Sequence, residues 1–446
     1  MSAPEFSYAP ETLRQLAADV LDHARQLGAS ACETDVSEAF GQSVTVRKDE
    51  VETIEYNRDK GVGVTVYLGQ RRGHASTSDF SRQALRATVE AALAIARYTA
   101  PDPCAGLPDE ALLARDSLDL DLYHPWALPV EEAIAIARRC EQAAFAVSPL
   151  VNNSEGASVS VQQSQFVSAN SLGFMGGFPT SRHYISCSVI AGENEAMQRD
   201  DWYTTGRDPG RLASPEAVGD YAARRALSRL SARRLSTRAV PVLFEAPLAA
   251  ALIGNFVHAA SGGALYRKSS FLQDSLGKAI FPSQVQISER PHLQGALTSS
   301  PFDDDGVATH DREVVADGVL KGYFLSTYSS RKLVMQTTGN AGGCHNLIVK
   351  SGHLDFRGLL REMGTGLLVT ELLGQGVNYV TGDYSRGAAG YWVEGGEIRY
   401  PVQEITIAGN LKEMLAGIVA VGSDVLVRGS KQVGSILVER MTVAGN

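Results

Sequence analysis

The chain has 446 residues, enough for two domains of ordinary size, and its 44% hydrophobic and 20% charged side chains are typical of a soluble globular protein. The net charge of −9 and the lack of a long Lys/Arg run predict no nucleic-acid partner, because nucleic-acid-binding surfaces concentrate positive charge. No apolar run approaches the ~18 residues of a membrane span, residues 1–7 do not resemble a signal peptide, and five scattered cysteines indicate reduced thiols, so we expect a cytoplasmic protein with no membrane association.

The first part of the chain begins with an amphipathic helix, because apolar residues recur at helical spacing from Leu13 to Leu27. Short alternating runs then predict strands at residues 31–39, 43–47, 51–56, 62–68 and 72–76, with turns at residues 48–50 and 57–61. A second helix follows at residues 84–96, and the prolines from Pro101 to Pro108 indicate a linker.

The same pattern then restarts. A helix is predicted at residues 129–147, followed by strand-like runs near residues 157–162, 164–170, 182–191 and 195–203, and by a helix that starts at Ser214-Pro215-Glu216. Residues 1–235 are therefore interpreted as a duplicated helix–β-meander–helix domain. It contains no convergent set of acids and bases, so we expect it to act as scaffold or interface.

Seven arginines lie near the end of this part. We interpret them as a solvated face close to a helix C-terminus, where cations suit the helix dipole, with an interdomain or intersubunit patch as the alternative. They are Arg211, Arg224, Arg225, Arg229, Arg233, Arg234 and Arg238.

Residues 236–446 are predicted to form a β-rich domain with one apolar helix. A buried strand at residues 239–244 precedes an apolar helix at residues 247–262, and Asp317-Gly318 predicts a hairpin. A second hairpin is predicted at residues 391–400, with a further strand at 402–407. The overall fold is expected to be α+β in two domains.

Two segments of this second domain are candidates for binding. Glycines surround Asp383, Tyr384, Ser385 and Arg386, which places two charges and two hydroxyls where another chain can approach the backbone. The alternative is a tight bulge in which Asp383 and Arg386 pair with each other. Arg267 and Lys268 stand in a polar loop that either contacts a substrate or partner, or is held by contacts between Arg267 and Asp274.

The glycine-rich segment at residues 339–346 contains adjacent Cys344 and His345. A thiol nucleophile with a histidine base is one interpretation. Neighbouring residues rarely point correctly for that hydrogen bond, and no third orienting group is evident, so a turn that allows close backbone approach explains the segment better.

Four long blocks of this sequence resemble one family. The first is Thr381-Gly-Asp-Tyr-Ser-Arg-Gly-Ala-Ala-Gly-Tyr-Trp-Val-Glu with the following Tyr-Pro-Val-Gln-Glu-Ile-Thr-Ile-Ala-Gly-Asn. The others are residues 262–278, 338–346 and 362–372. In this order they resemble the TldD/PmbA family of peptidase-complex proteins, and within it the PmbA branch, also called TldE. The resemblance is dense from about residue 245 onward and diffuse before it.

The resemblance also implies where a metal should be. Members of the TldD branch carry His-Glu-x-x-x-His on the apolar helix and a cysteine near the C-terminus, a set suited to zinc. This chain has Asn255-Phe-Val-His-Ala-Ala-Ser-Gly-Gly, with His258 alone, and residues 427–435 contain no cysteine. We therefore expect no metal or catalytic residue on this chain, and zinc on a TldD-type partner.

The resemblance implies a subunit of a cytoplasmic zinc metallopeptidase complex, a heterodimer with a TldD-type subunit that degrades or processes unfolded or modified peptides. Within it, Arg267, Lys268, Asp383, Tyr384, Ser385 and Arg386 are the candidate contacts to substrate or partner. The alternative is a non-catalytic peptide-binding or regulatory protein that acts without hydrolysis.

Overall fold

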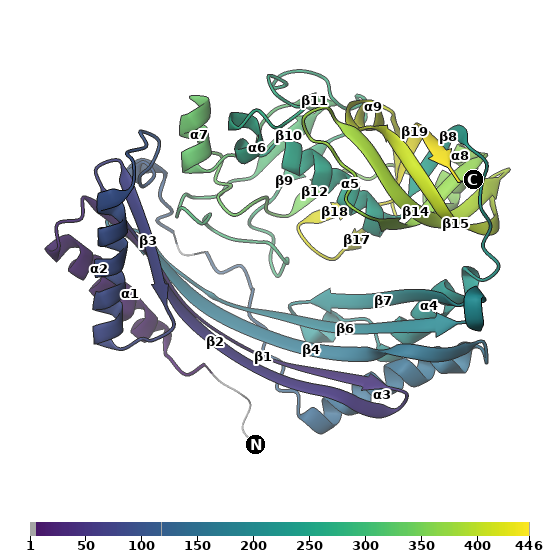
Figure 1. Cartoon of the computed structure of the whole chain (residues 1–446), viewed down its shortest axis with the longest axis horizontal. Coiled ribbons are helices and arrows are strands. Elements are labelled where there is room, and N and C mark those ends of the chain that lie inside the picture. Colours follow the sequence, from purple (N-terminus) through teal and green to yellow (C-terminus); the bar gives the residue numbers. More distant parts are fainter. Residues whose placement is uncertain (1–5, 117, 446) are drawn as a thin grey trace.

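The computed structural model describes residues 6–116 and 118–445, and its first half consists of one large sheet with helices on one face (Figure 1). The helices of this half are α1 (Pro10–Gln26), α2 (Arg82–Tyr98), α3 (Val130–Val147) and α4 (Pro215–Ser228), with 3-10 turns η1 (Glu110–Leu112), η2 (Asn194–Ala196) and η3 (Pro209–Arg211). The strands are β1 (Ala31–Arg47), β2 (Glu50–Leu68), β3 (Arg71–Thr77), β4 (Val151–Asn170), β5 (Met175–Gly176), β6 (Pro179–Ala191) and β7 (Gln198–Gly206).

The large sheet has the strand order β3-β2-β1-β4-β6-β7, with β5 beside β4, and all neighbouring strands are antiparallel. In chain order α1 is followed by β1, β2, β3 and then α2, whereas α3 is followed by β4, β5, β6, β7 and then α4. β1 and β4 join the two series, because Glu33 to Val46 pair with Asn170 to Ala157 without a break.

The predicted strand boundaries were wrong in this half, because several short runs merge into strands of 17 to 20 residues. The turn expected at residues 57–61 does not exist: Asn57 pairs with Gly41, and pairing continues to Gly61 opposite Ser37. These residues lie on a sheet edge, since β3 pairs with β2 only from Val62 onward. Charged side chains are common on edge strands, so their polarity does not indicate a turn there.

Two helix pairs cover the same face of the large sheet. Val36 and Val44 of β1 point to this face, Val36 into the core beneath α1 and α2, and Val44 into the core beneath α3 and α4. Residues an even number apart on a strand share a face, so the four helices form one layer. The opposite face curves around the second half of the molecule (Figure 1).

The second half combines two six-stranded sheets with short helices. The helices are α5 (Ala246–Ala259), α6 (Gly262–Tyr266), α7 (Thr327–Leu333), α8 (Phe356–Met363) and α9 (Leu411–Ala416). The strands are β8 (Arg238–Phe244), β9 (Ile287–Glu289), β10 (Arg312–Ala316), β11 (Val319–Leu320), β12 (Leu347–Val349), β13 (Gly366–Leu373), β14 (Asp383–Glu394), β15 (Glu397–Asn410), β16 (Ile418–Val421), β17 (Leu426–Val427), β18 (Lys431–Val433) and β19 (Ile436–Ala444).

Five of these strands close into a small barrel. The order β15-β14-β13-β8-β19 returns to its start because Thr406–Ala408 of β15 pair with Ala444–Thr442 of β19. The other sheet runs β11-β10-β9-β12-β18-β17. The hairpin predicted at Asp317-Gly318 is confirmed between β10 and β11. The further strand predicted at 402–407 is not separate, since it continues β15.

The predicted apolar helix is confirmed as α5, and it lies at the centre of the largest core. Its buried residues recur at helical spacing, from Ala246 and Ala249 through Ile253 to Phe256. They pack with Val242 and other residues of the barrel strands. On another side of the barrel α8 packs Leu359 and Met363 onto strand residues such as Leu243. α5 is thus held rigidly, with its outer face open to neighbouring loops.

A buried ion-pair network joins the two halves and corrects the interpretation of the arginines as a solvated face. Arg225 Nη1 donates to Glu245 Oε1 at 2.8 Å, and Arg225 Nε donates to Asp200 Oδ1 at 3.0 Å. Arg229 pairs with Asp200 and Glu371. Arg224, which points the other way on α4, pairs with Asp220 at the surface. Helical periodicity therefore divides these arginines between an interface and solvent.

The fold class is mixed α+β, as predicted. In the described residues no helix is long and apolar enough to cross a membrane.

Candidate functional site

Four segments meet at the C-terminal half of α5, and two of them are far from it in the sequence. They are α5 itself, the segment at residues 374–386, the polar loop after α6, and the segment around β18 that includes Lys431. Tyr379 connects the first three: its hydroxyl donates to Asn255 Oδ1 at 2.8 Å, its ring lies 4.0 Å from that of His258, and its carbonyl accepts from Phe271 N at 2.7 Å. This meeting point is the candidate functional site.

Asp383, Tyr384, Ser385 and Arg386 lie at the start of β14, with alternating orientation. Asp383 and Ser385 are exposed, whereas Tyr384 is buried in the main core. Asp383 accepts from Thr381 Oγ1 at 2.7 Å and from Asn410 Nδ2 at 3.2 Å, and these bonds lower the pKa of Asp383. Asp383 is thus held by its neighbours and forms no ion pair with Arg386 in the described structure.

Arg386 lies on the same side of β14 as Tyr384, next to the candidate site. Burial raises the pKa of Tyr384 to about 12, and the nearby positive charge of Arg386 opposes that rise. The Nε of Arg386 is buried and has no hydrogen-bond partner among the described residues. A buried, unpaired guanidinium N–H is costly, so Arg386 retains an unused donor at this site.

Arg267 and Lys268 lie in the exposed loop that follows α6. Arg267 stacks over the ring of Tyr266 and its Nη1 donates to the Tyr266 hydroxyl at 3.1 Å; it makes no contact with Asp274 that would tie the loop. The Tyr266 ring meets that of Tyr328 on α7 at 5.8 Å. Lys268 takes a left-handed conformation with φ of 57° as the loop leaves α6. Both cations therefore remain accessible.

The side chains around α5 do not suit a zinc ion. His258 is exposed and its ring lies tilted against that of Tyr379, Ser261 caps α6, and Gly262 packs against Ser329. The segment that would contribute a cysteine is beside α5, but it brings Lys431: a Cβ added at Gly254 would lie 3.7 Å from Lys431 Cε. Across residues 6–116 and 118–445, no three His, Cys, Asp or Glu side chains gather as metal ligands would.

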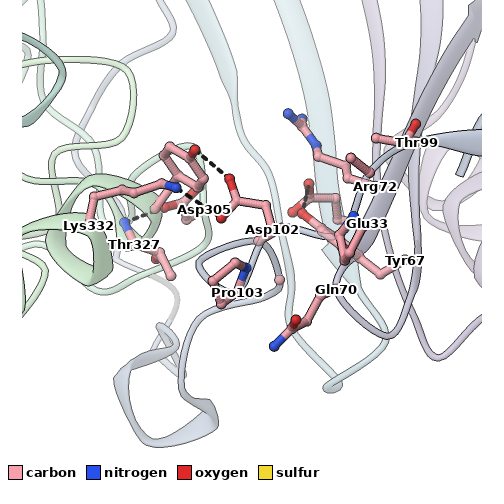
Figure 2. A pocket seen from close by; sticks show the side chains of 15 residues that line it. Glu33, Tyr67, Gln70, Arg72, Thr99, Asp102, Pro103, Asp305, Thr327 and Lys332 are labelled. Carbon is pink, nitrogen blue, oxygen red and sulfur yellow. Dashed lines mark hydrogen bonds and ion pairs between the residues drawn. The ribbon is translucent and has the colours of Figure 1, made fainter. Parts of the chain in front are cut away.

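A cavity of about 710 Å³ lies apart from α5, between one end of the large sheet and α7 (Figure 2). Its walls carry Glu33, Tyr67 and Arg72 from the sheet, and Lys332 from α7, with Asp102 of the linker between them. No motif in the sequence indicates this cavity. Each of its residues looks ordinary in its own segment, and only the tertiary fold brings them together.

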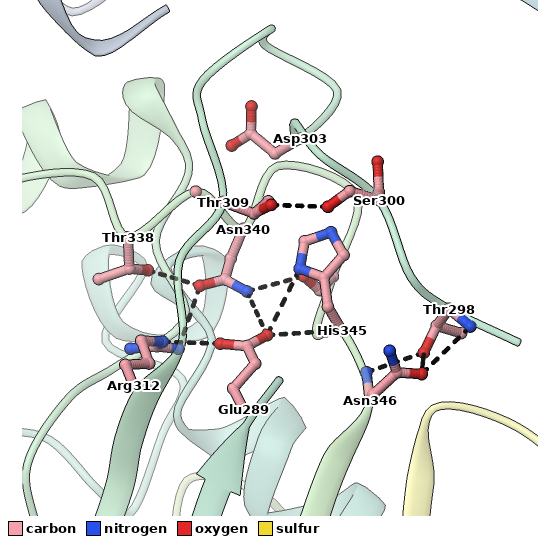
Figure 3. A network of polar contacts seen from close by, with 12 residues as sticks. Glu289, Thr298, Ser300, Asp303, Thr309, Arg312, Thr338, Asn340, His345 and Asn346 are labelled. Carbon is pink, nitrogen blue, oxygen red and sulfur yellow. Dashed lines mark hydrogen bonds and ion pairs between the residues drawn. The ribbon is translucent and has the colours of Figure 1, made fainter. Parts of the chain in front are cut away.

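The glycine-rich segment at residues 339–346 forms a buried polar network around Glu289 (Figure 3). Glu289 accepts from Arg312 Nε at 2.6 Å, Asn340 Nδ2 at 2.8 Å and the backbone N–H of His345 at 2.7 Å. Although burial alone would raise the pKa of Glu289, the bonds from His345 and the charge of Arg312 hold it below its usual value.

The same segment does not present an activated thiol. Burial raises the pKa of Cys344, which reduces the thiolate fraction at neutral pH. The Nδ1 of His345 lies 3.5 Å from Glu289 Oε1, so this histidine is engaged with the carboxylate. The segment therefore serves mainly to fix the loops around β9 and β12.

Comparison with known proteins gives a consistent family assignment. Family models of PmbA/TldA metallopeptidases match three parts of the chain: domain 1 at residues 32–96, the central domain at 123–230 and the C-terminal domain at 237–445. Metalloprotease PmbA of Escherichia coli O157:H7 is 50% identical over 438 residues, which cover 98% of this chain and 97% of the relative. The PmbA homologue of Haemophilus influenzae is 49% identical over 439 residues, 98% and 97% of the two chains.

Solved structures share the fold. A proposed modulator of DNA gyrase from Bacteroides thetaiotaomicron superposes with a TM-score of 0.93 at 26% identity, covering 98% of this chain and 100% of that one. TldE from Thermococcus kodakarensis gives a TM-score of 0.82 at 18% identity, covering 96% and 100%, which supports the fold alone. The family models and the two PmbA relatives together establish that the chain belongs to the PmbA/TldD family of metallopeptidases, in its PmbA branch.

Proposed function

We propose that this chain is the PmbA-type, metal-free subunit of a cytoplasmic zinc metallopeptidase complex, and that a TldD-type partner holds the zinc and hydrolyses the peptide. In this proposal residues 1–235 form a duplicated scaffold and interface domain, and residues 236–446 form a peptidase-like domain beside the partner's active site. The substrates are unfolded or modified peptides.

One observation carries the proposal: the two elements that the family resemblance links to metal binding are neighbours here, but they present Gly254, His258 and Lys431. A lysine ammonium next to a divalent cation is repelled, and a single exposed histidine cannot hold zinc. The two elements are thus still neighbours, but the side chains that they carry there cannot together hold a zinc ion. Such a surface can shape a neighbouring site without providing the water-activating metal.

The shape of the proposed complex also explains its substrates. Two chains of similar fold that face each other across a pseudo-two-fold axis would enclose a space between them. A space of that kind excludes folded proteins and admits extended chains. The exposed residues around Tyr379, with Arg267, Lys268 and Arg386, are the parts of this chain that we place toward the partner and the peptide.

The test is reconstitution with a TldD-type partner. The isolated chain should contain no stoichiometric zinc by elemental analysis and should not cleave an unstructured peptide. The mixture should cleave that peptide, and a chelator should abolish the cleavage. Substitution of the partner's histidines should remove activity, whereas His258→Ala in this chain should leave both zinc content and activity in place.

Two results would contradict the proposal. One is a partner that is fully active without this chain. The other is loss of zinc from the complex when His258 is replaced by alanine. If the chain bound peptides but never restored cleavage, a non-catalytic peptide-binding or regulatory role would replace the one proposed.

A further inference from the structure

The cavity between the large sheet and α7 has a lining with unused binding capacity (Figure 2). At about 710 Å³, it lies within the usual range of about 300–1,000 Å³ for small-molecule sites. Tyr67 and Arg72 are directly paired across β2 and β3, and Tyr67 donates to Glu33 Oε1 at 2.9 Å. These residues form one wall, and Thr327, Tyr328 and Lys332 of α7 form the facing wall.

Part of this lining is already engaged. Asp102 accepts from the Tyr328 hydroxyl at 2.7 Å, from Lys332 Nζ at 3.0 Å and from the backbone N–H of Cys104 at 2.9 Å. The bonds from Tyr328 and Cys104 lower the pKa of Asp102 to about 2, so the carboxylate stays ionised and paired. Asp102 and Lys332 therefore fix the walls relative to each other and leave little capacity for a ligand.

The other charged groups of the lining form no direct ion pair among the described residues. Among the described residues Arg72 makes no hydrogen bond or ion-pair contact, although its charge opposes the rise that burial causes in the pKa of Glu33. Neither Glu33 nor Asp305 has a cation within ion-pair distance, and each accepts a hydrogen bond from a neutral donor. The hydroxyl of Thr327, a residue only 5% exposed, has no hydrogen-bond partner. A buried orphan hydroxyl is costly unless something that the cavity receives satisfies it.

These groups define the chemistry of the occupant. A guanidinium binds a carboxylate with two parallel hydrogen bonds, and two carboxylates attract an ammonium group. Pro101 and Pro103 supply apolar surface between the charged groups. A polyanion such as a nucleotide is disfavoured, because the charged groups without a direct ion pair comprise two acids and one base.

We propose that this cavity binds short zwitterionic peptides, with the carboxylate at Arg72 and the ammonium group between Glu33 and Asp305. This inference rests on the proposed function for its biological meaning, since a peptidase complex generates such peptides by hydrolysis. The site lies on this chain alone, however, and binding requires neither zinc nor a partner.

The test is calorimetric titration of the full chain with tri-alanine at neutral pH, beside its N-acetylated and C-amidated forms. We expect saturable binding of the free tripeptide and at least about tenfold weaker binding of each blocked form, because each lacks one charge-assisted interaction. Arg72→Gln should weaken the free tripeptide about tenfold and bring it level with the amide. Arg71→Gln is the matched control, since Arg71 bonds to the Arg97 carbonyl outside the cavity.

Glu33→Gln keeps an acceptor for Tyr67 and should remove the preference for a free amino group over an acetylated one. No saturation of the wild-type chain up to about 10 mM would overturn the inference, as would equal affinity for free and blocked peptides. If the chain does not bind tri-alanine, the reconstituted complex can still cleave its peptide. If reconstitution fails, the isolated chain can still bind tri-alanine. The two proposals can therefore be rejected independently.

Discussion

Glu289 illustrates how a single buried residue organises several loops. It is 2% exposed and its carboxylate collects donors from Arg312, Asn340 and His345 (Figure 3). A second cluster lies beside it, where Asn346 Oδ1 accepts from Thr298 Oγ1 at 2.9 Å. Because a buried charge is stable only when its partners are complete, each of these loops depends on the others.

We predict that Glu289→Gln destabilises the protein by about 3–5 kcal/mol, since it leaves the Arg312 charge without its buried partner. Urea unfolding followed by circular dichroism would measure the change. Glu313→Gln is the control, because Glu313 pairs with Arg290 near the surface and should cost about 1 kcal/mol or less.

The wild-type protein and the Glu289→Gln variant also allow a test of how stability depends on pH. The folded pKa of Glu289 lies below its unfolded value, so its stabilising contribution is full above the unfolded pKa of about 4.3 and is lost as the pH falls through the folded pKa. The difference in stability between wild type and Glu289→Gln should therefore shrink on acidification. A difference that stayed constant or grew would show that the charge of Glu289 is not what holds the network.

We predict that Arg386→Ala weakens peptide turnover by the complex with a TldD-type partner but leaves the melting temperature nearly unchanged. Among the described residues the Nε of Arg386 has no hydrogen-bond partner and the guanidinium forms no ion pair, so the substitution mainly removes its contact with Tyr384. Asp383→Ala is the comparison, since Asp383 is bonded to Thr381 and Asn410 and should affect stability before turnover. A large loss of stability in Arg386→Ala with normal turnover would assign Arg386 a purely structural role.

The lack of a pair between Asp383 and Arg386 could have been predicted from the alternation of side chains along a strand. Residues three apart on a strand face opposite sides, so Asp383 and Arg386 could not be expected to pair once β14 was recognised. No comparable pattern indicated Tyr379, whose contacts with Asn255, His258 and Phe271 arise only from tertiary packing. The residues of the cavity are distributed in the same way over five separate segments.

At the scale of elements, α3 and α4 approach each other through a glycine. A Cβ added at Gly219 would overlap the carbonyl oxygen of Cys140, so the two helix backbones are nearly in contact at this point. Gly73 has the corresponding role where β3 meets α2, since a Cβ there would overlap the carbonyl of Ala92. Each of these two contacts, one between helices and one between a strand and a helix, thus depends on a residue that has no side chain.

We expect Gly219→Ala to destabilise the protein by about 2 kcal/mol or more, because overpacking against backbone cannot be relieved by a rotamer change. This reverses the usual benefit of alanine in a helix. Gly429→Ala is the matched control, since nothing lies within 4 Å of its added Cβ. Thermal unfolding of the two variants would compare them, and equal melting temperatures would refute this view of the helix contact.

The helices were largely predictable and the strand boundaries were not. Apolar spacing located α1, α2, α3 and α5, because a helix that covers a sheet must present one apolar face. Strand ends depend instead on where a neighbouring strand stops. Residues 57–61 are polar because they lie on an edge, which the sequence alone could not distinguish from a turn.

At the scale of the whole molecule, the network around Arg225 holds the large sheet against the barrel. Arg225 is 14% exposed and bridges Asp200 of β7 and Glu245 at the start of α5, while its guanidinium also stacks over Trp202. Burial protects these pairs from screening by salt.

We predict that Arg225→Ala lowers the free energy of unfolding by about 3–5 kcal/mol, because it leaves Asp200 and Glu245 buried with fewer partners. The neighbouring Arg224→Ala removes the same charge from an exposed pair with Asp220 and should cost about 0.5 kcal/mol. The gap between the two variants should persist at high salt. A gap that closed in salt would indicate that the Arg225 pairs are accessible to solvent.

The closed ring of strands also affects how the protein can be made. β8, at residues 238–244, pairs with β19, at residues 436–444, so nearly two hundred residues must be synthesised between the first barrel strand and the neighbour that completes its pairing. The large sheet needs nothing beyond residue 206 and can form while translation continues. A ribosome that stalls within the last strand would therefore expose a finished first half carrying an unclosed, aggregation-prone second half.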